Sequence, residues 1–205
     1  MAKTNNLMDA FEKYKSTGNN EFFTLADDGD TAIVRFLYSS FEELDWFVVH
    51  ETEIGGKKRW VECTEVPDCP LCAQSGRPQL KLFLQLVQKG KEDTVMTWER
   101  GQRFIPQIQE LFQNHSDLTQ QIFEIERKGK KGDANTKYII HHIAESKVDM
   151  ESLPERQVFL GEDGFILQKT HKQMREILAG NYQYHKVENP VPRGNTAAKK
   201  DVEVF

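Results

Sequence analysis

The stretch TAIVRFLYSSFEELDWFVVHETEIGGKKRWVEC, residues 31–63, decides the fold of this chain. Three runs rich in Val, Ile, Phe, Tyr and Trp lie at 31–38, 44–50 and 58–63. Such runs are typical of β-strands. The dipeptide Gly55-Gly56 separates the last two runs and predicts a hairpin. The stretch therefore predicts antiparallel β-structure.

The same reasoning extends this pattern along the chain. We expect further strands at 80–88, 94–99, 120–127 and 136–143, with Lys- and Gly-rich turns inside each pair. Apolar residues at helical spacing predict helices at 5–17, 101–113 and 169–179. Short antiparallel strands with a few helices indicate a mainly β (α+β) fold. We expect a five-stranded barrel of the OB-fold type with peripheral helices.

Length and composition bound the organisation. With 205 residues and 38% hydrophobic residues, the chain can form one core without disulfides. We expect an N-terminal helical arm at 1–25, a core domain at 26–185 and a flexible tail at 186–205. No apolar run is long enough to span a membrane, and the N-terminus has no signal-peptide core. The sequence thus predicts a protein that is neither secreted nor membrane-bound.

The charge is unevenly distributed. The net charge is −5, but residues 1–54 carry 4 basic and 11 acidic residues, while residues 55–137 carry 14 and 11. A nucleic-acid site requires local rather than overall positive charge. The middle third of the chain is therefore the candidate region for such a site.

The cysteines form the most specific motif. Three is an odd number, which argues against a disulfide framework. Cys69 and Cys72 are separated by two residues, the spacing of a knuckle that binds one tetrahedral metal ion. Cys63 precedes the knuckle, and His50 ends an expected strand, so the hairpin between them can bring both to the knuckle. We expect these four residues to hold one Zn²⁺ ion.

This zinc would be structural, because three thiolates and an imidazole leave no open coordination position. It would fasten a subdomain at about residues 50–72 to the strands. Two alternatives stay open: Glu62 or Asp68 replaces His50 as the fourth ligand, or the cysteines are free buried thiols.

The sequence motifs do not match those of the enzyme classes that they resemble in part. Zinc nucleobase deaminases carry His-x-Glu before Pro-Cys-x-x-Cys, but here Thr52 takes the glutamate position and Asp68 the proline position. His141 and His142 alternate on an expected strand and cannot serve one site. The sequence has no phosphate-loop or nucleophile-elbow motif. We therefore expect a protein that is not an enzyme.

The order of four segments resembles a known family. The segments are Ala32-Ile33-Val34-Arg35-Phe36-Leu37, Phe47-Val48-Val49-His50, Arg59-Trp60-Val61-Glu62-Cys63 and Asp68-Cys69-Pro70-Leu71-Cys72. Together they resemble the zinc-containing single-stranded DNA-binding proteins of T-even-type phages, and the hairpin at 123–132 is also similar. The resemblance covers roughly residues 30–143. It implies an OB-fold with a His-Cys-Cys-Cys zinc subdomain that binds single-stranded DNA without regard to sequence.

The resemblance further implies a phage-encoded protein in the cytoplasm of a bacterial host, acting in viral DNA replication, recombination and repair. The segment Lys13-Tyr14-Lys15-Ser16-Thr17 is similar to the family's N-terminal self-association motif. The closing Asp201-Val202-Glu203-Val204-Phe205 resembles the acidic tip with which bacterial single-strand binders dock replication proteins. Self-association along DNA and partner docking by the tail are the corresponding expectations.

A binder of this kind needs a basic groove for phosphates and aromatic faces for bases. The candidate DNA contacts are Arg35, Lys57, Lys58, Arg59, Trp60, Lys81, Phe83, Trp98, Arg103, Arg127, Lys128, Lys130, Lys131 and Tyr138. The aromatic candidates have a competing assignment to the core, and Arg35 could instead pair with a buried acid. Two other functions stay open: a zinc-stabilised protein-interaction module of a replication complex, and an RNA-binding OB protein.

Overall fold

The computed structural model describes residues 21–64, 68–74, 76–133, 135–161 and 164–182. The strands are β1 Glu21–Phe22, β2 Thr31–Phe36, β3 Trp46–Ile54, β4 Lys57–Glu62, β5 Gln79–Gln88, β6 Lys91–Gly101, β7 Gln121–Lys128, β8 Lys137–Glu145, β9 Leu160–Gly161 and β10 Ile166–Leu167. The α-helices are α2 Pro70–Gln74, α3 Ile105–Asn114 and α4 His171–Leu178. The 3-10 turns are η1 Phe41–Glu43, η2 Gln102–Phe104, η3 Leu118–Gln120 and η4 Met150–Ser152. The expected helix at 5–17 and the tail at 186–205 lie outside the described residues.

The mainly β prediction is confirmed, and all seven expected strands are present. The hairpin at Gly55-Gly56 is also confirmed, since both glycines adopt positive φ angles of 59° and 74° between β3 and β4. Positive φ at both positions of a two-residue turn matches the twist of the flanking strands. The helix expected at 101–113 starts later, at Ile105, because Pro106 belongs in a first helical turn.

All ten strands belong to one sheet, in the order β8-β7-β2-β5-β3-β4-β10-β9, with β6 and β1 branching from β5. The sheet is open: among the described strands, no pairing joins β8 to β9. The expected barrel closure is therefore not confirmed. On one edge β5 pairs with β3 at Gln79–Leu82 and with β2 at Leu86–Gln88, while its other edge pairs with β6.

Both faces of β5 are buried. Leu82, Leu84 and Leu86 belong to the main core, which also receives Ile108 and Leu111 of α3. The opposite face is covered by the segment before α4. A strand buried on both faces is nearly continuously apolar, as the buried stretch 82–87 of β5 is, with Gln85 as its one polar residue.

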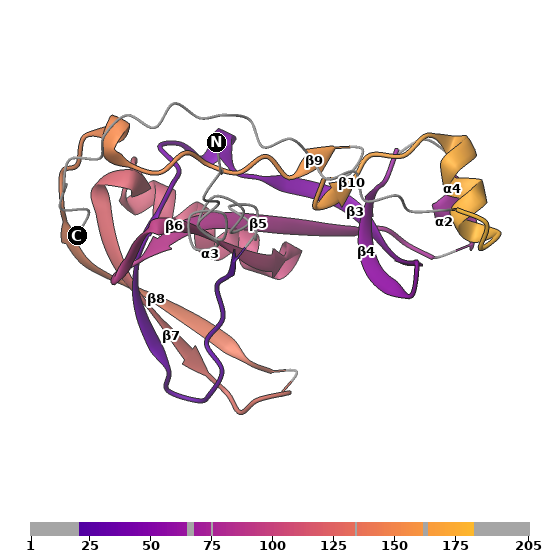
Figure 1. The fold of residues 1–205 in the computed structure, drawn as a ribbon. Helices are drawn as coiled ribbons and strands as arrows, with labels where there is room; N and C mark the ends of the chain where they lie inside the picture. Colours follow the sequence, from indigo (N-terminus) through magenta and orange to yellow (C-terminus); the bar gives the residue numbers. More distant parts are fainter. Residues whose placement is uncertain (1–20, 65–67, 75, 134, 162–163, 183–205) are drawn as a thin grey trace, which may run out of the picture.

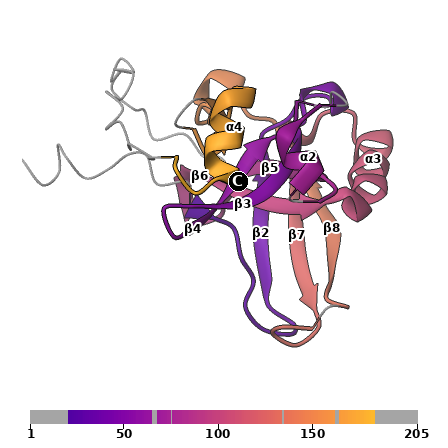
Figure 2. The same ribbon diagram turned by 90° about the vertical axis from the view of Figure 1, so that its right-hand side faces the viewer.

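A second, smaller core lies at the far end of β3 and β4. It contains Val61, Leu71, two cysteines and the α4 residues Met174 and Ile177. Figure 1 shows the β3–β4 and β7–β8 hairpins at opposite ends of β5, both extending below it. Figure 2, turned by 90°, shows α4 and α3 on opposite sides of the view, each above a different part of the sheet. None of the described helices is long and apolar enough to cross a membrane.

Candidate metal centre and cationic cleft

Four side chains meet where the β3–β4 hairpin joins α2. His50, Cys63, Cys69 and Cys72 place their ligand atoms within 4.8 Å of one another. Cys63 Sγ lies 4.0 Å from Cys69 Sγ and 3.6 Å from Cys72 Sγ. His50 Nε2 lies 3.7 Å from Cys69 Sγ and 3.4 Å from Cys72 Sγ. This buried cluster could hold a metal ion.

Backbone bonds set this geometry. Cys63 follows the end of β4, and its N–H donates to Val48 O at 2.8 Å, which holds it beside His50 on β3. Cys72 N–H donates to Cys69 O at 3.1 Å, so the first turn of α2 aims both knuckle sulfurs at the hairpin. The positions of Cys69 and Cys72 are thus set by local backbone structure, whereas those of His50 and Cys63 depend on the pairing of β3 with β4.

The donor set and distances fit a tetrahedral ion. An ion at about 2.3 Å from each thiolate requires sulfur atoms about 3.8 Å apart, which is close to the spacing found. The cluster includes His50 and neither Glu62 nor Asp68. Glu62 instead accepts a hydrogen bond from Gln168 Nε2 at 3.3 Å.

Electrostatics also favour a bound cation. Burial and hydrogen bonding with Cys63 and Cys69 raise the pKa of the Cys72 thiol to about 12. At Cys69 burial acts in the same direction, but hydrogen bonds from Cys72 N–H and Thr64 outweigh it and lower the pKa to about 7. Burial lowers the pKa of His50, which keeps its imidazole neutral and able to bind metal. With its pKa raised to about 12, the Cys72 thiol would need a nearby cation to become a thiolate at neutral pH.

Helix α4 closes this module from outside. Met174 and Ile177 contribute to the core that contains Cys63 and Cys69. Thr64 Oγ1 lies 3.2 Å from His171 Nε2 at the start of α4. The Thr170 capping box fixes where that helix begins. The C-terminal helix therefore packs on the metal module rather than on the main core.

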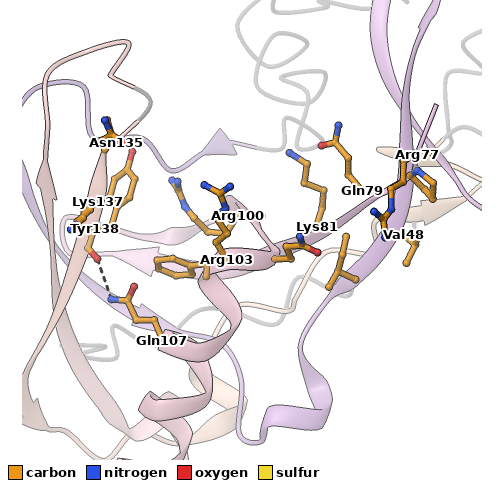
Figure 3. Close-up of a pocket in the computed structure, with 16 residues that line it drawn as sticks. Val48, Arg77, Gln79, Lys81, Arg100, Arg103, Gln107, Asn135, Lys137 and Tyr138 are labelled. Atoms are coloured by element: carbon orange, nitrogen blue, oxygen red, sulfur yellow. Dashed lines mark hydrogen bonds between the residues drawn. The ribbon is translucent and has the colours of Figure 1, made fainter. Parts of the chain in front are cut away.

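A second feature is an open cleft of about 1010 Å³ between the two hairpins. Its lining includes five basic residues and no carboxylate. The basic residues are Arg77, Lys81, Arg100, Arg103 and Lys137. Figure 3 shows Lys137 and Tyr138 entering from the β7–β8 side and Arg77 and Gln79 from the opposite end, with Arg100 and Arg103 between them.

Arg100 occupies an unusual position in this cleft. Its guanidinium carbon lies 4.3 Å from the centre of the Trp98 ring and 4.1 Å from that of Tyr138. Burial lowers its pKa, although the Tyr138 hydroxyl and Glu99 act in the opposite direction. Among the described residues no ion pair joins Arg100 to a carboxylate, and its Nε has no hydrogen-bond partner. Arg100 is thus a half-buried cation held by aromatic faces, without a paired anion among the described residues.

The cleft also includes part of the sequence-predicted set. Lys81, Arg103 and Tyr138 line it. Lys81 Nζ lies 4.8 Å from the Trp60 ring centre and 2.8 Å from a Glu99 carboxylate oxygen. Trp60 is half-buried against the residues on the opposite face of β5 and does not line the cleft.

Three predicted DNA contacts are wrong because their side chains are fully buried. Trp98 lies among Phe23, Phe36 and Phe104 in the main core. Phe83 packs with Phe159 in the core of the opposite sheet face.

Arg35, the third of these, donates hydrogen bonds to the carbonyls of Thr119 and Ser146. It therefore joins two loops to β2, and burial lowers its pKa despite the charge of Asp117. In this structure it presents no atom to a ligand.

The remaining predicted contacts lie on the hairpins outside the cleft. Lys57, Lys58 and Arg59 belong to β4, and Lys58 pairs with Glu51. Lys128 pairs with Glu126 near the tip of the other hairpin, where Lys130 and Lys131 are exposed.

Arg127 has a structural position in that hairpin. It donates to the carbonyls of Leu25, Gly129 and Lys130 and to the Tyr138 hydroxyl. These bonds hold the turn of the β7–β8 hairpin to its strands.

Sequence reasoning missed two cleft residues as contacts, Arg77 and Phe104. Arg77 follows α2, and Phe104 ends η2. The one available signal for Arg77 is the basic charge of residues 55–137, which also includes the cleft residues Arg100 and Lys137. Neither the models of known protein families nor the curated proteins compared with this chain match it.

Proposed function

We propose that this protein binds single-stranded DNA without regard to sequence, and that the cleft between its hairpins receives the strand. In this proposal the strands around β5 form an OB-related core, and a structural zinc ion occupies the His50 and cysteine cluster. The protein would protect and organise single strands during viral replication, recombination and repair. The resemblance of the segments at 32–72 to phage single-strand binders supports this biological setting.

The observation that carries the proposal is the composition of the cleft. Five basic residues and no carboxylate line it, in a protein whose net charge is −5, and of the five only Lys81 has an ion pair with a carboxylate among the described residues, that of Glu99. A charge as buried as Arg100 is costly unless an anion or several hydrogen bonds compensate it. A phosphate group would supply that anion, and Arg binds phosphate through its planar fork of donors.

Aromatic faces add the second requirement. Phe104 and Tyr138 line the same cleft, and both are partly exposed. Bases of a single strand can stack on such rings, and every base offers a ring face, so stacking tolerates any sequence. Bases in a duplex are already stacked on one another, so we expect a strong preference for unpaired strands.

The zinc ion would act structurally in this scheme. When bound, it would join the knuckle to the β3–β4 hairpin through His50, Cys63, Cys69 and Cys72. Arg77 follows the knuckle by five residues, and Val48 precedes His50 by two; both line the cleft. The cluster therefore positions one wall of the proposed binding surface.

The test is a titration of fluorescently end-labelled oligo-dT with the full chain at several salt concentrations. Binding is measured by the fluorescence anisotropy of the label. Duplex DNA and RNA of the same length serve as competitors. We expect binding that prefers the single DNA strand and weakens with salt, with a log–log slope of about −0.7 for each phosphate contacted.

Two charge reversals locate the site. Arg103→Glu lies in the cleft, and Lys172→Glu is an equally exposed reversal on α4. We expect the first to weaken binding to all sequences and the second to leave it unchanged. Absence of binding at low salt, or equal loss in both variants, contradicts the proposal. Preferential binding of RNA would assign the cleft to RNA instead.

A further inference from the structure

Trp46 is the most exposed tryptophan, and it lies on the same strand as Val48, a residue of the cleft lining. Its side chain is 56% exposed at the start of β3, whereas Trp98 is fully buried and Trp60 is half-buried. Large aromatic side chains favour burial, because their ring surface is mostly apolar. The exposure of a tryptophan in a strand of the central sheet therefore suggests that its ring contacts a ligand.

Strand register places Trp46 on the face that forms the cleft. Trp46 pairs directly with Leu82 of β5, and Leu82 pairs with Arg100 of β6. Opposite residues in antiparallel strands share a face, so these three side chains form one row across the sheet. With strands spaced by 4.7–4.9 Å, Trp46 and Arg100 are about 10 Å apart along that row.

The next position on β3 confirms this orientation. Val48 lies two residues after Trp46, on the same face, and it lines the cleft. Its cross-strand partner Leu80 also lines the cleft. Trp46 thus shares a sheet face with Val48 and Leu80 of the cleft lining, while Leu82 between Trp46 and Arg100 is buried in the main core.

Trp46 has no aromatic or cationic partner on its ring among the described residues, whereas Trp98 contacts Phe23, Phe104 and Arg100. We infer that Trp46 is a base-stacking platform at the rim of the cleft, occupied by an unpaired base whose phosphates lie along the cationic lining. This inference rests on the proposed function and adds a contact that the cleft lining does not include.

The experiment compares Trp46→Ala, Trp46→Phe and Phe22→Ala on two strands of equal length, one normal and one abasic. Phe22 is a matched control, because it is also an exposed aromatic residue but stacks on Phe165 of the opposite sheet face. Thermal unfolding of each variant verifies that it folds.

We expect Trp46→Ala to weaken binding to the normal strand about 5-fold to 150-fold, the range for one stacked base. Trp46→Phe should lose less, and Phe22→Ala should match the wild type. On the abasic strand, wild type and Trp46→Ala should bind equally, because no base is present to stack. Tryptophan quenching by oligo-dT should largely disappear in Trp46→Phe.

Two results overturn the inference while leaving the proposed function intact: Trp46→Ala binds the normal strand as tightly as wild type, or its loss is equally large on the abasic strand. Failure of the wild type to bind any single strand has a different meaning. It would overturn the proposed function, and the stacking platform with it.

Discussion

The two hairpins beside the cleft have similar lysine-rich ends but different anchors. At its base the β3–β4 hairpin has His50 and Cys63 of the metal cluster and a small core shared with α4. The β7–β8 hairpin instead inserts Phe123 and Ile125 into the main core. In the proposed zinc-bound protein, one hairpin therefore depends on a coordinated ion and the other on apolar burial.

Their turns differ in the same way. The β3–β4 turn is two glycines whose positive φ angles suffice to reverse the chain. The β7–β8 turn is longer, and the Arg127 side chain holds it through hydrogen bonds to carbonyl groups. Similar surface chemistry is thus supported by different interactions, and each can be removed without the other.

The largest expected effect is loss of the metal. In Cys69→Ser, or after chelation, we expect β4, α2 and α4 to lose protection from hydrogen exchange while β7 and β8 keep theirs. Structural zinc contributes about 10–16 kcal/mol of apparent binding energy in small domains, comparable with the whole stability of a typical protein. Mass-spectrometric hydrogen exchange measures both hairpins at once. Equal loss of protection in both would show that they share one anchor.

Truncation of the other anchor comes next. Phe123→Ala should lower the free energy of unfolding by about 3–5 kcal/mol, because it leaves a cavity beside Phe36 in the main core. Urea denaturation measures the change, and Ile139→Ala on the exposed side of β8 is the control. The folded variant should still bind one metal ion. A variant that lost its metal in proportion to its stability would refute separate anchoring.

A smaller effect is expected at the hairpin turn. Arg127→Lys keeps the charge but loses the fork of donors that reaches Gly129 and Lys130, and should cost about 1–3 kcal/mol. Exchange of the amides at 129–136 should accelerate in this variant. Unchanged exchange there would show that the strands alone hold the turn.

The smallest expected effect is on the stability of the protein at acid pH, through Glu126. Hydrogen bonding from Lys128 and from His141 lowers the pKa of the Glu126 carboxyl below its ordinary value. The ionised Glu126 carboxylate therefore stabilises the folded state at pH values above the ordinary carboxyl pKa. This contribution to the free energy of unfolding is lost as the pH falls through the lowered pKa. Glu126→Gln should flatten the decline of stability on the acid side, measured by urea titration at several pH values. A steeper loss of stability with falling pH in the variant would contradict the stabilising effect assigned to the Glu126 carboxylate.

The metal cluster could be predicted from sequence because its specificity is mostly local. The Cys69–Cys72 spacing defines half of the ligand set, and the Gly55-Gly56 turn brings His50 back to Cys63. The expected strands share this local basis in alternation and turn residues. The two-residue strands β9 and β10 depend on tertiary pairing and have no comparable signal.

The cleft was less accessible to prediction, for two physical reasons. Alternation separates the two faces of a strand but does not tell which face is covered, and around Phe83 of β5 both faces are. For this reason the sequence leaves Phe83 open between DNA stacking and the core. The cleft also joins residues from elements far apart in sequence, such as Arg77 and Lys137. Their proximity follows from the way β5 spans the two hairpins, which no local pattern encodes.

That spanning strand has a consequence for binding kinetics. The ten residues of β5 extend about 33 Å, and the strand pairs with β3 at one end and with β2, the neighbour of β7, at the other. The separation of the hairpins is therefore fixed by the fold, and a single strand bound as proposed would have to lose its own conformational freedom to fit. Changes inside such a preformed cleft should act mainly on the dissociation rate, whereas salt should act mainly on the association rate.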